Sequence, residues 1–188
     1  STSNCINCCG NFLVRGGTVS SSFLSNAVAG SKIVDNVFYS IANPTSYSGI
    51  ANQIDNTLIH GNRISLRRGT DGGTDPCILS IGNNVIISNN VCADGGTGIL
   101  IDNASGSVSL SADNILIQGN LCRGNTGGIN VRSRVGFTST DIVIKDNLVI
   151  DNTTSGGIAF YVTCGCPMIL DNLYANFVSS THINSPCP

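Results

Sequence analysis

The stretch "NILIQGNLCRGNTGGINV", residues 114–131, consists of short apolar segments separated by Gly-Asn and Gly-Gly pairs. Nearly the same phrase occurs as "NVIISNNVCADGGTGILI" at 84–101 and as "DIVIKDNLVIDNTTSGGIAF" at 141–160. Short apolar segments bounded by Gly and Asn are typical of β-strands. The repetition predicts a fold built from a series of similar units.

One asparagine marks the same place in every phrase: Asn11, Asn36, Asn62, Asn90, Asn120, Asn147 and Asn172. Successive members are 25 to 30 residues apart, which is a period typical of solenoids. The residues three positions earlier are Cys8, Ile33, Ile59, Ile87, Ile117, Ile144 and Ile169. Stacked β-branched side chains suit a buried strand column, so we expect this column to face the core. The residues two positions after the asparagines are expected to form a second inward column.

The residue before each asparagine is always Gly, Asn or Asp: Gly10, Asp35, Gly61, Asn89, Gly119, Asp146 and Asp171. These residue types tolerate the left-handed αL conformation, so the column predicts a tight corner between two short strands. The asparagine that follows is expected to turn inward and exchange amide hydrogen bonds with its equivalents one coil away. A Gly-Ile element further along, as at 97–99 and 127–129, begins a third strand.

This order of strand, corner, strand, loop and Gly-Ile strand resembles one coil of the right-handed parallel β-helix superfamily. That superfamily includes pectate lyases, polygalacturonases and phage tailspikes. The resemblance covers nearly the whole chain and implies an all-β fold: a single-stranded right-handed parallel β-helix of about seven coils with an asparagine ladder. We expect residues 1–188 to form one domain, either alone or as a segment or end-stacked subunit of a larger assembly.

The charge pattern argues against two classes of partner. Only 11% of residues are charged and the formal net charge is −2, without a basic stripe for phosphates, so we expect no nucleic-acid partner. No apolar run reaches the length of a membrane-spanning helix, so we expect no membrane insertion. No zinc-like spacing of ligands is present, and neither a metal nor a cofactor is predicted.

Nine cysteines in 188 residues favour disulfides, and hence an extracellular or virion-surface location. Cys92 and Cys122 are expected one coil apart in the second inward column, either as a disulfide or as a buried thiol pair. The terminal candidates for disulfides are Cys5, Cys8 and Cys9 at one end and Cys164, Cys166 and Cys187 at the other. The sequences beginning at Asn103 and Asn152 match N-glycosylation sequons.

Two outward columns are largely apolar over the last five coils. The candidate interface residues are Leu58, Ile86, Leu116, Val143 and Met168 in one column and Val91, Leu121, Leu148 and Leu173 in the other. Apolar patches of this kind mark interaction sites. We therefore expect copies of the chain to associate side by side, as in a trimer, or end to end.

The resemblance implies that a polysaccharide-cleaving relative would act on the face of the Gly-Ile strand. The weak catalytic candidates are Arg132, Arg134 and Asp102, with Ca²⁺ as a cofactor only for a lyase. The weak candidates for glycan contact are Asn130 and Tyr161 on this face and Arg67 and Arg68 in a polar loop. Leu79, Leu100 and Ala159 are also expected to point outward there.

Three hypotheses for the function follow. The first is a structural or receptor-facing β-helix of an extracellular or virion assembly, such as a tailspike, decoration or filament subunit. The second is a polysaccharide lyase or glycoside hydrolase acting on an acidic glycan, and the third is a non-catalytic module that binds cell-surface polysaccharide. The absence of Glu, of an Asp-Asp pair and of Trp favours the first.

Overall fold

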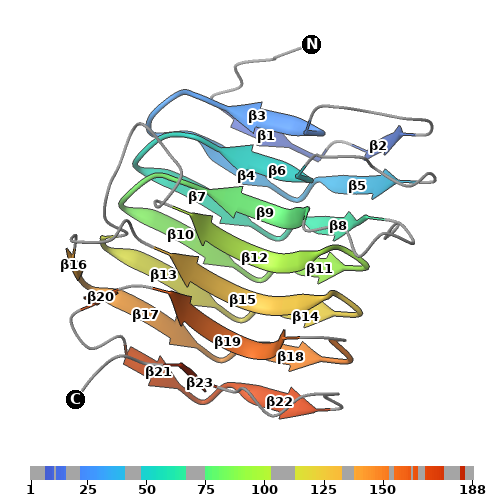
Figure 1. Cartoon of the computed structure of the whole chain (residues 1–188). Helices are drawn as coiled ribbons and strands as arrows, with labels where there is room; N and C mark the ends of the chain where they lie inside the picture. The colour runs from blue at the N-terminus through green and yellow to red at the C-terminus, as the bar shows by residue number, and fades with distance from the viewer. Residues whose placement is uncertain are drawn as a thin grey trace.

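The computed structural model describes residues 7–10, 12–15, 22–40, 48–66, 75–102, 113–132, 138–152, 155–161, 163–164, 168–175 and 183–184. These residues contain 23 strands and no helix. Three parallel sheets of seven strands each form the body of the molecule, and coils are stacked from the N-terminal to the C-terminal side (Figure 1). Outside them, β16 (Thr138–Ser139) pairs with β20 (Thr163–Cys164).

Each coil contributes one strand to each sheet. Sheet A consists of β1 (Asn7–Cys9), β4 (Lys32–Val34), β7 (Thr57–His60), β10 (Val85–Ser88), β13 (Ile115–Gln118), β17 (Ile142–Lys145) and β21 (Met168–Leu170). Sheet B consists of β2 (Phe12–Arg15), β5 (Val37–Ser40), β8 (Arg63–Ser65), β11 (Val91–Ala93), β14 (Leu121–Arg123), β18 (Leu148–Ile150) and β22 (Leu173–Ala175). Sheet C consists of β3 (Leu24–Asn26), β6 (Ile50–Asn52), β9 (Pro76–Ser80), β12 (Thr97–Asp102), β15 (Gly127–Arg132), β19 (Ser155–Tyr161) and β23 (Ile183–Asn184).

Neighbouring strands in each sheet therefore come from successive coils. About four coils, from β4 to β15, have all three strands described together with their side chains. The predicted all-β parallel solenoid is confirmed.

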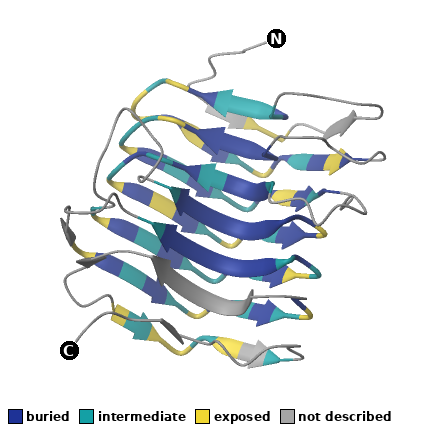
Figure 2. Cartoon of the chain, viewed as in Figure 1, coloured by how far each residue is buried: buried dark blue, intermediate teal, exposed yellow. Residues whose placement is uncertain are grey.

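Parallel pairing holds equivalent residues in register and builds a continuous core. Ile33, Ile59, Ile87, Ile117 and Ile144 are successive partners in sheet A, and each is 0% exposed. The second inward column is also buried, at Phe38, Ile64, Cys92, Cys122 and Val149. Figure 2 shows this burial along the strands. For these residues, the prediction of which side chains face the core is confirmed.

The predicted corner between sheets A and B is present in every coil. All seven residues of that column have positive φ, from 50° at Asp171 to 67° at Gly61. The pattern of residue types also has a steric cause, because a Cβ on Gly119 would lie 2.5 Å from Asn89 Oδ1. At Gly119 a larger residue would require the exposed Asn89 side chain to move away from the corner.

Two further corner columns were not predicted. Before sheet A, Gly30, Asn56, Asn84, Asn114 and Asp141 have positive φ. Between sheets B and C, positive φ is found at Asp94, Gly124 and Asp151. The solenoid thus turns through αL residues at all three junctions between its sheets.

Buried asparagine side chains connect the coils beside the first corner. The asparagine row consists of Asn36, Asn62, Asn90, Asn120, Asn147 and Asn172, and each Nδ2 donates to the next Oδ1 at 2.8–3.0 Å. The backbone N–H groups of the first five members donate to the same oxygens at 2.9–3.0 Å. Asn11 lies outside the described residues. The row satisfies backbone groups that the corners leave without strand partners.

Candidate functional site

The outward apolar residues form one column in sheet A and one in sheet B, on either side of the corner that joins the two sheets. We call the nine candidate interface residues named above the apolar stripe. In β10, Ile86 is 42% exposed between Val85 and Ile87, which are both 0% exposed. Met168 and Leu173 are exposed at 54% and 64%, and the other six members are half-buried. The side chains therefore point away from the core, as predicted.

Register makes the stripe continuous. Ile86 pairs directly with Leu58 and Leu116, and Val143 continues the column to Met168. Neighbouring parallel strands are about 4.8 Å apart, so adjacent side chains are in contact range.

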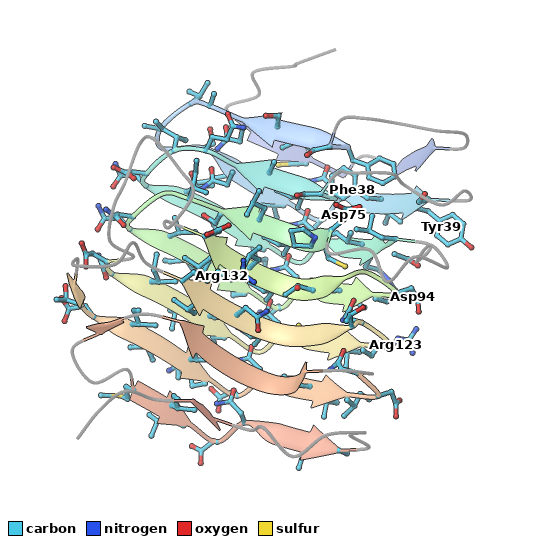
Figure 3. All side chains as sticks on the ribbon, viewed as in Figure 1. Phe38, Tyr39, Asp75, Asp94, Arg123 and Arg132 are labelled. Carbon is cyan, nitrogen blue, oxygen red and sulfur yellow. The ribbon has the colours of Figure 1, made fainter. Side chains whose placement is uncertain are left out.

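Polar residues lie between the two columns of the stripe, at the corner that joins sheets A and B. His60 Nδ1 and Ser88 Oγ are hydrogen-bonded at 2.8 Å. Gln118 Nε2 donates to Asp146 Oδ2 at 3.2 Å. In β5 of sheet B, Tyr39 is 47% exposed and points away from the body, whereas its neighbour Phe38 is buried (Figure 3).

The face of sheet C differs from the prediction at its centre. Leu100 and Asn130 were expected to be outward surface residues, yet they are only 8% and 5% exposed. Alternation along a strand sets the direction of a side chain, and it does not determine how far that side chain is covered. The expectation that these two side chains are exposed is therefore wrong, and glycan contact at Asn130 stays a prediction.

The other residues proposed for sheet C are only partly described. Asp102 and Arg132 are half-buried partners in register at the ends of β12 and β15, and Arg132 lies on the sheet C side (Figure 3). The backbone of Tyr161 continues this column in β19. Arg67, Arg68 and Arg134 lie outside the described residues.

The described residues of this face do not form a metal-binding cluster. No three His, Cys, Asp or Glu side chains converge within the described ranges in a way that could hold a metal ion. The Oδ1 atom of Asn130 is buried without a hydrogen-bond partner, but a single amide oxygen is not a ligand set for Ca²⁺.

The four cysteines whose side chains are described are free thiols. Cys92 and Cys122 are in-register partners, and both are buried thiols, while Cys9 is exposed. Cys77, which the sequence did not connect with them, is also buried. Burial raises the pKa of the Cys92 thiol well above its usual range, and its contacts with Cys122 and Cys77 act in the same direction. Such a thiol is a core residue and a poor nucleophile.

Of the terminal cysteines, Cys5, Cys166 and Cys187 lie outside the described residues. Cys8 and Cys164 are described only through their backbones, in β1 and β20.

A second set of hydrogen-bonded asparagines was missed. Asn125 Oδ1 accepts the Gly95 N–H at 2.9 Å, and the Asn125 N–H donates to Asn152 Oδ1 at 3.0 Å. The signal was present, because Gly124-Asn125 and Asp151-Asn152 repeat the corner-asparagine pair of the first column. Asn152, the acceptor residue of one sequon, is 1% exposed. Asn103 lies outside the described residues.

The described part of the chain contains no helix with the length and apolar character that a membrane crossing requires. No family model, no curated protein and no solved structure matches this chain. The class of protein is therefore defined by strand topology: a parallel β-solenoid with an outward apolar stripe.

Proposed function

We propose that this chain is a structural subunit of an extracellular or virion assembly and that copies pack side by side through the apolar stripe. The observation that carries the proposal is the exposure of Ile86, Met168 and Leu173 within one continuous column system. Burying a fully exposed side chain of this size contributes roughly 1.5–3 kcal/mol, and these three are 42%, 54% and 64% exposed, so each contributes about half of that. Contributions from several stripe residues of both copies are needed to reach the range of about 4–15 kcal/mol that association costs.

The handedness of the solenoid, the number of its coils and the extent of the asparagine ladder are also part of this proposal. We propose a right-handed β-helix of seven coils, because crossover connections between parallel strands are right-handed in nearly all proteins. Asn11 stands in the same sequence position as the members of the asparagine row and would extend that row to a ladder through all seven coils. The resemblance to pectate lyases and tailspikes rests on this repeated coil.

Covalent reinforcement is a separate part of the proposal. Among the described cysteines, Cys9 is the exposed one, so it can reach a cysteine of another copy. We expect mass spectrometry under non-reducing conditions to show linked chains that separate on reduction. A mass that is the same with and without reductant would contradict disulfide reinforcement and leave the packing of the stripe to the next experiment.

Mutation of the stripe tests side-by-side packing. Ile86→Asp places a carboxylate at its centre, whereas Asn89→Asp adds the same charge at an αL corner of the same coil, where other coils already have Asp. We expect Ile86→Asp to raise the dissociation constant at least about tenfold, which is about 1.4 kcal/mol, and Asn89→Asp to leave it near the wild-type value. Sedimentation velocity measures both. Equal association by the two variants, or a wild-type chain that never associates laterally, would refute the proposal.

The hydrolytic and glycan-binding hypotheses have less support, because Asn130 is buried and Arg132 and Asp102 are the only two catalytic candidates described. Incubation with acidic polysaccharides, followed by assay for reducing ends or unsaturated uronates, tests them. Cleavage that Arg132→Ala abolishes would favour the enzyme over the structural subunit.

A further inference from the structure

The outward side of sheet A has the same order of polar and apolar residues in four successive coils. In β7, β10, β13 and β17, one apolar stripe residue points outward. Two positions before it stands an exposed Asn or Asp at the αL corner, and two positions after it stands a half-buried polar residue. The four triplets are Asn56, Leu58 and His60; Asn84, Ile86 and Ser88; Asn114, Leu116 and Gln118; and Asp141, Val143 and Lys145.

Strand register arranges these triplets as three columns, with the apolar column in the middle. Leu58, Ile86, Leu116 and Val143 are successive partners, and so are His60, Ser88, Gln118 and Lys145. In the column of corner residues, Asn114 Nδ2 donates to Asn84 Oδ1 at 2.8 Å. All four strands are inner strands of sheet A, each paired on both sides.

A single apolar column is buried when it packs face to face against the same column of a second copy. Two arrangements with two-fold symmetry do this. If the axis runs along the column, the solenoids are parallel, each strand meets the same strand of the other copy, and the axis exchanges the two polar columns. If the axis runs along a strand, the solenoids are antiparallel, and each polar column meets itself in reverse coil order.

The charges beside β17 distinguish the two arrangements. Asp141 is exposed and Lys145 is half-buried, and neither side chain forms an ion pair with another described residue. They stand four positions apart in extended chain, roughly 13 Å, which is too far for contact within one copy. The parallel arrangement places Asp141 of each copy opposite Lys145 of the other, so that two pairs of opposite charge form per dimer.

The other coils are compatible with the parallel arrangement. The same exchange brings an asparagine opposite His60, Ser88 or Gln118, and these amide, imidazole and hydroxyl groups can hydrogen-bond to each other. In the antiparallel arrangement, matching the four apolar residues in reverse order places Asp141 opposite Asn56 and Lys145 opposite His60. No opposite charges pair in that case, and complementary charge is what selects one orientation over another.

From these columns we infer that two copies pack as a parallel dimer about a two-fold axis along the apolar column of sheet A, with Asp141 of each copy paired with Lys145 of the other. The inference rests on the proposed function, because it uses the sheet A column of the apolar stripe and specifies its occupant. The contact joins identical surfaces, so it closes as a dimer. Lys32, which occupies the column one coil before Leu58, would meet its own equivalent, so the contact begins at β7.

Reversal of one charge and removal of the other test the pairing. Lys145→Asp creates two contacts between like charges, and we expect it to raise the dissociation constant at least about tenfold. Adding Asp141→Asn removes the like charge on the opposite copy, and other coils already have Asn at this αL corner. We expect the double variant to lower the dissociation constant again by at least about threefold. Sedimentation velocity measures association and mass, and circular dichroism establishes that the variants are folded.

Asp146→Asn is the matched control for that recovery. Asp146 is also an αL corner residue and is adjacent to Lys145, but it lies on the far side of Lys145 from the axis and does not face Lys145 of the second copy. We expect the variant with both Lys145→Asp and Asp146→Asn to associate as weakly as Lys145→Asp alone. An unchanged dissociation constant in Lys145→Asp, or equal recovery by Asp141→Asn and Asp146→Asn, would overturn the inference.

A zero-length carbodiimide cross-linker, which joins a Lys amine to a carboxylate in contact with it, tests the orientation in the unmodified chain. The sequence contains two lysines, Lys32 and Lys145. We expect the covalent dimer to contain peptides in which Lys145 is linked to Asp141. Covalent dimers in which Lys145 is linked to other carboxylates and not to Asp141 would contradict the parallel pairing.

Ile86→Asp separates this inference from the proposed function. If Ile86→Asp dissociates the wild-type assembly and Lys145→Asp does not, lateral packing through the stripe stands and the parallel pairing is wrong. A laterally associated wild-type trimer would likewise contradict the two-fold dimer and leave the stripe as the contact. A wild-type chain that stays monomeric would overturn both.

Discussion

Replacing Asn120 by Ala should destabilise the solenoid from the middle of the asparagine row. Asn120 is 1% exposed, and its Oδ1 accepts from Asn90 N at 2.9 Å and Asn90 Nδ2 at 3.0 Å. Its Nδ2 donates to Ile87 O at 2.9 Å. In the Ala variant, the buried N–H of Asn90 and the carbonyl of Ile87 lose these partners.

The size of the effect follows from those two groups. The Asn90 N–H is left without a partner, which costs about 1–3 kcal/mol, whereas Ile87 O keeps its partner in β13 and loses one hydrogen bond worth about 0.5–1.5 kcal/mol. We therefore expect the free energy of unfolding to fall by about 3 kcal/mol. A chain of 188 residues has a stability on the order of 9–28 kcal/mol, so the variant should still fold and can be measured.

Asn172→Ala is the matched control, because it removes the same side chain from the half-buried end of the row. Water can replace its oxygen for the Asn147 N–H, so we expect a loss of about 1 kcal/mol. Urea unfolding of both variants, with equal slopes against denaturant, gives the difference. Losses that agree to within about 0.5 kcal/mol would show that the asparagine row does not stabilise the fold in the way we derive.

Two further predictions concern a corner and a thiol. Gly119→Ala should lower the free energy of unfolding by about 2 kcal/mol, because the new residue has αL strain and contacts Asn89. Gly30→Ala has nothing within 4 Å of the added Cβ, so it should lower the free energy of unfolding by the αL strain alone, about 1 kcal/mol. Equal urea midpoints for the two variants would contradict the steric argument. Because the pKa of Cys92 is raised in the folded chain, its contribution to stability is full below the unfolded pKa of about 8.5 and is lost as the pH rises toward the folded value. Cys92→Ala should therefore flatten the fall in stability above that pH, and an unchanged slope would exclude this source. At pH 8, iodoacetamide should alkylate Cys9 and leave Cys92 unmodified until the chain unfolds.

The repeated core could be predicted because every coil meets the same physical demands. An inward position must be apolar, and the tight corner between sheets A and B must accept positive φ. The first demand explains the isoleucines Ile87 and Ile117, and the second explains the corner residues Asn89 and Gly119. The two other corner columns were predictable by the same rule. They were missed because the alignment was anchored on a single asparagine per coil.

The face of sheet C could not be predicted in this way. Alternation indicates that Asn130 points away from Ile129 and Val131, yet Asn130 is 5% exposed, and alternation alone does not give the exposure of a side chain. The contact of Cys77 with Cys92 is also non-local, since it joins sheets C and B within the core. Repeat analysis aligns equivalent positions one coil apart and does not relate different sheets of the solenoid.

The outward columns supply the argument for a partner, because the fold does not dictate their residues. Lys32 and Arg63 occupy the same columns as Leu116 and Leu121, so the fold accepts charged side chains there. Strand propensity does not explain the apolar residues either, since Thr and Tyr would satisfy it equally well with polar groups toward solvent. We propose burial against a neighbouring copy as the cause of the apolar series from Ile86 to Met168.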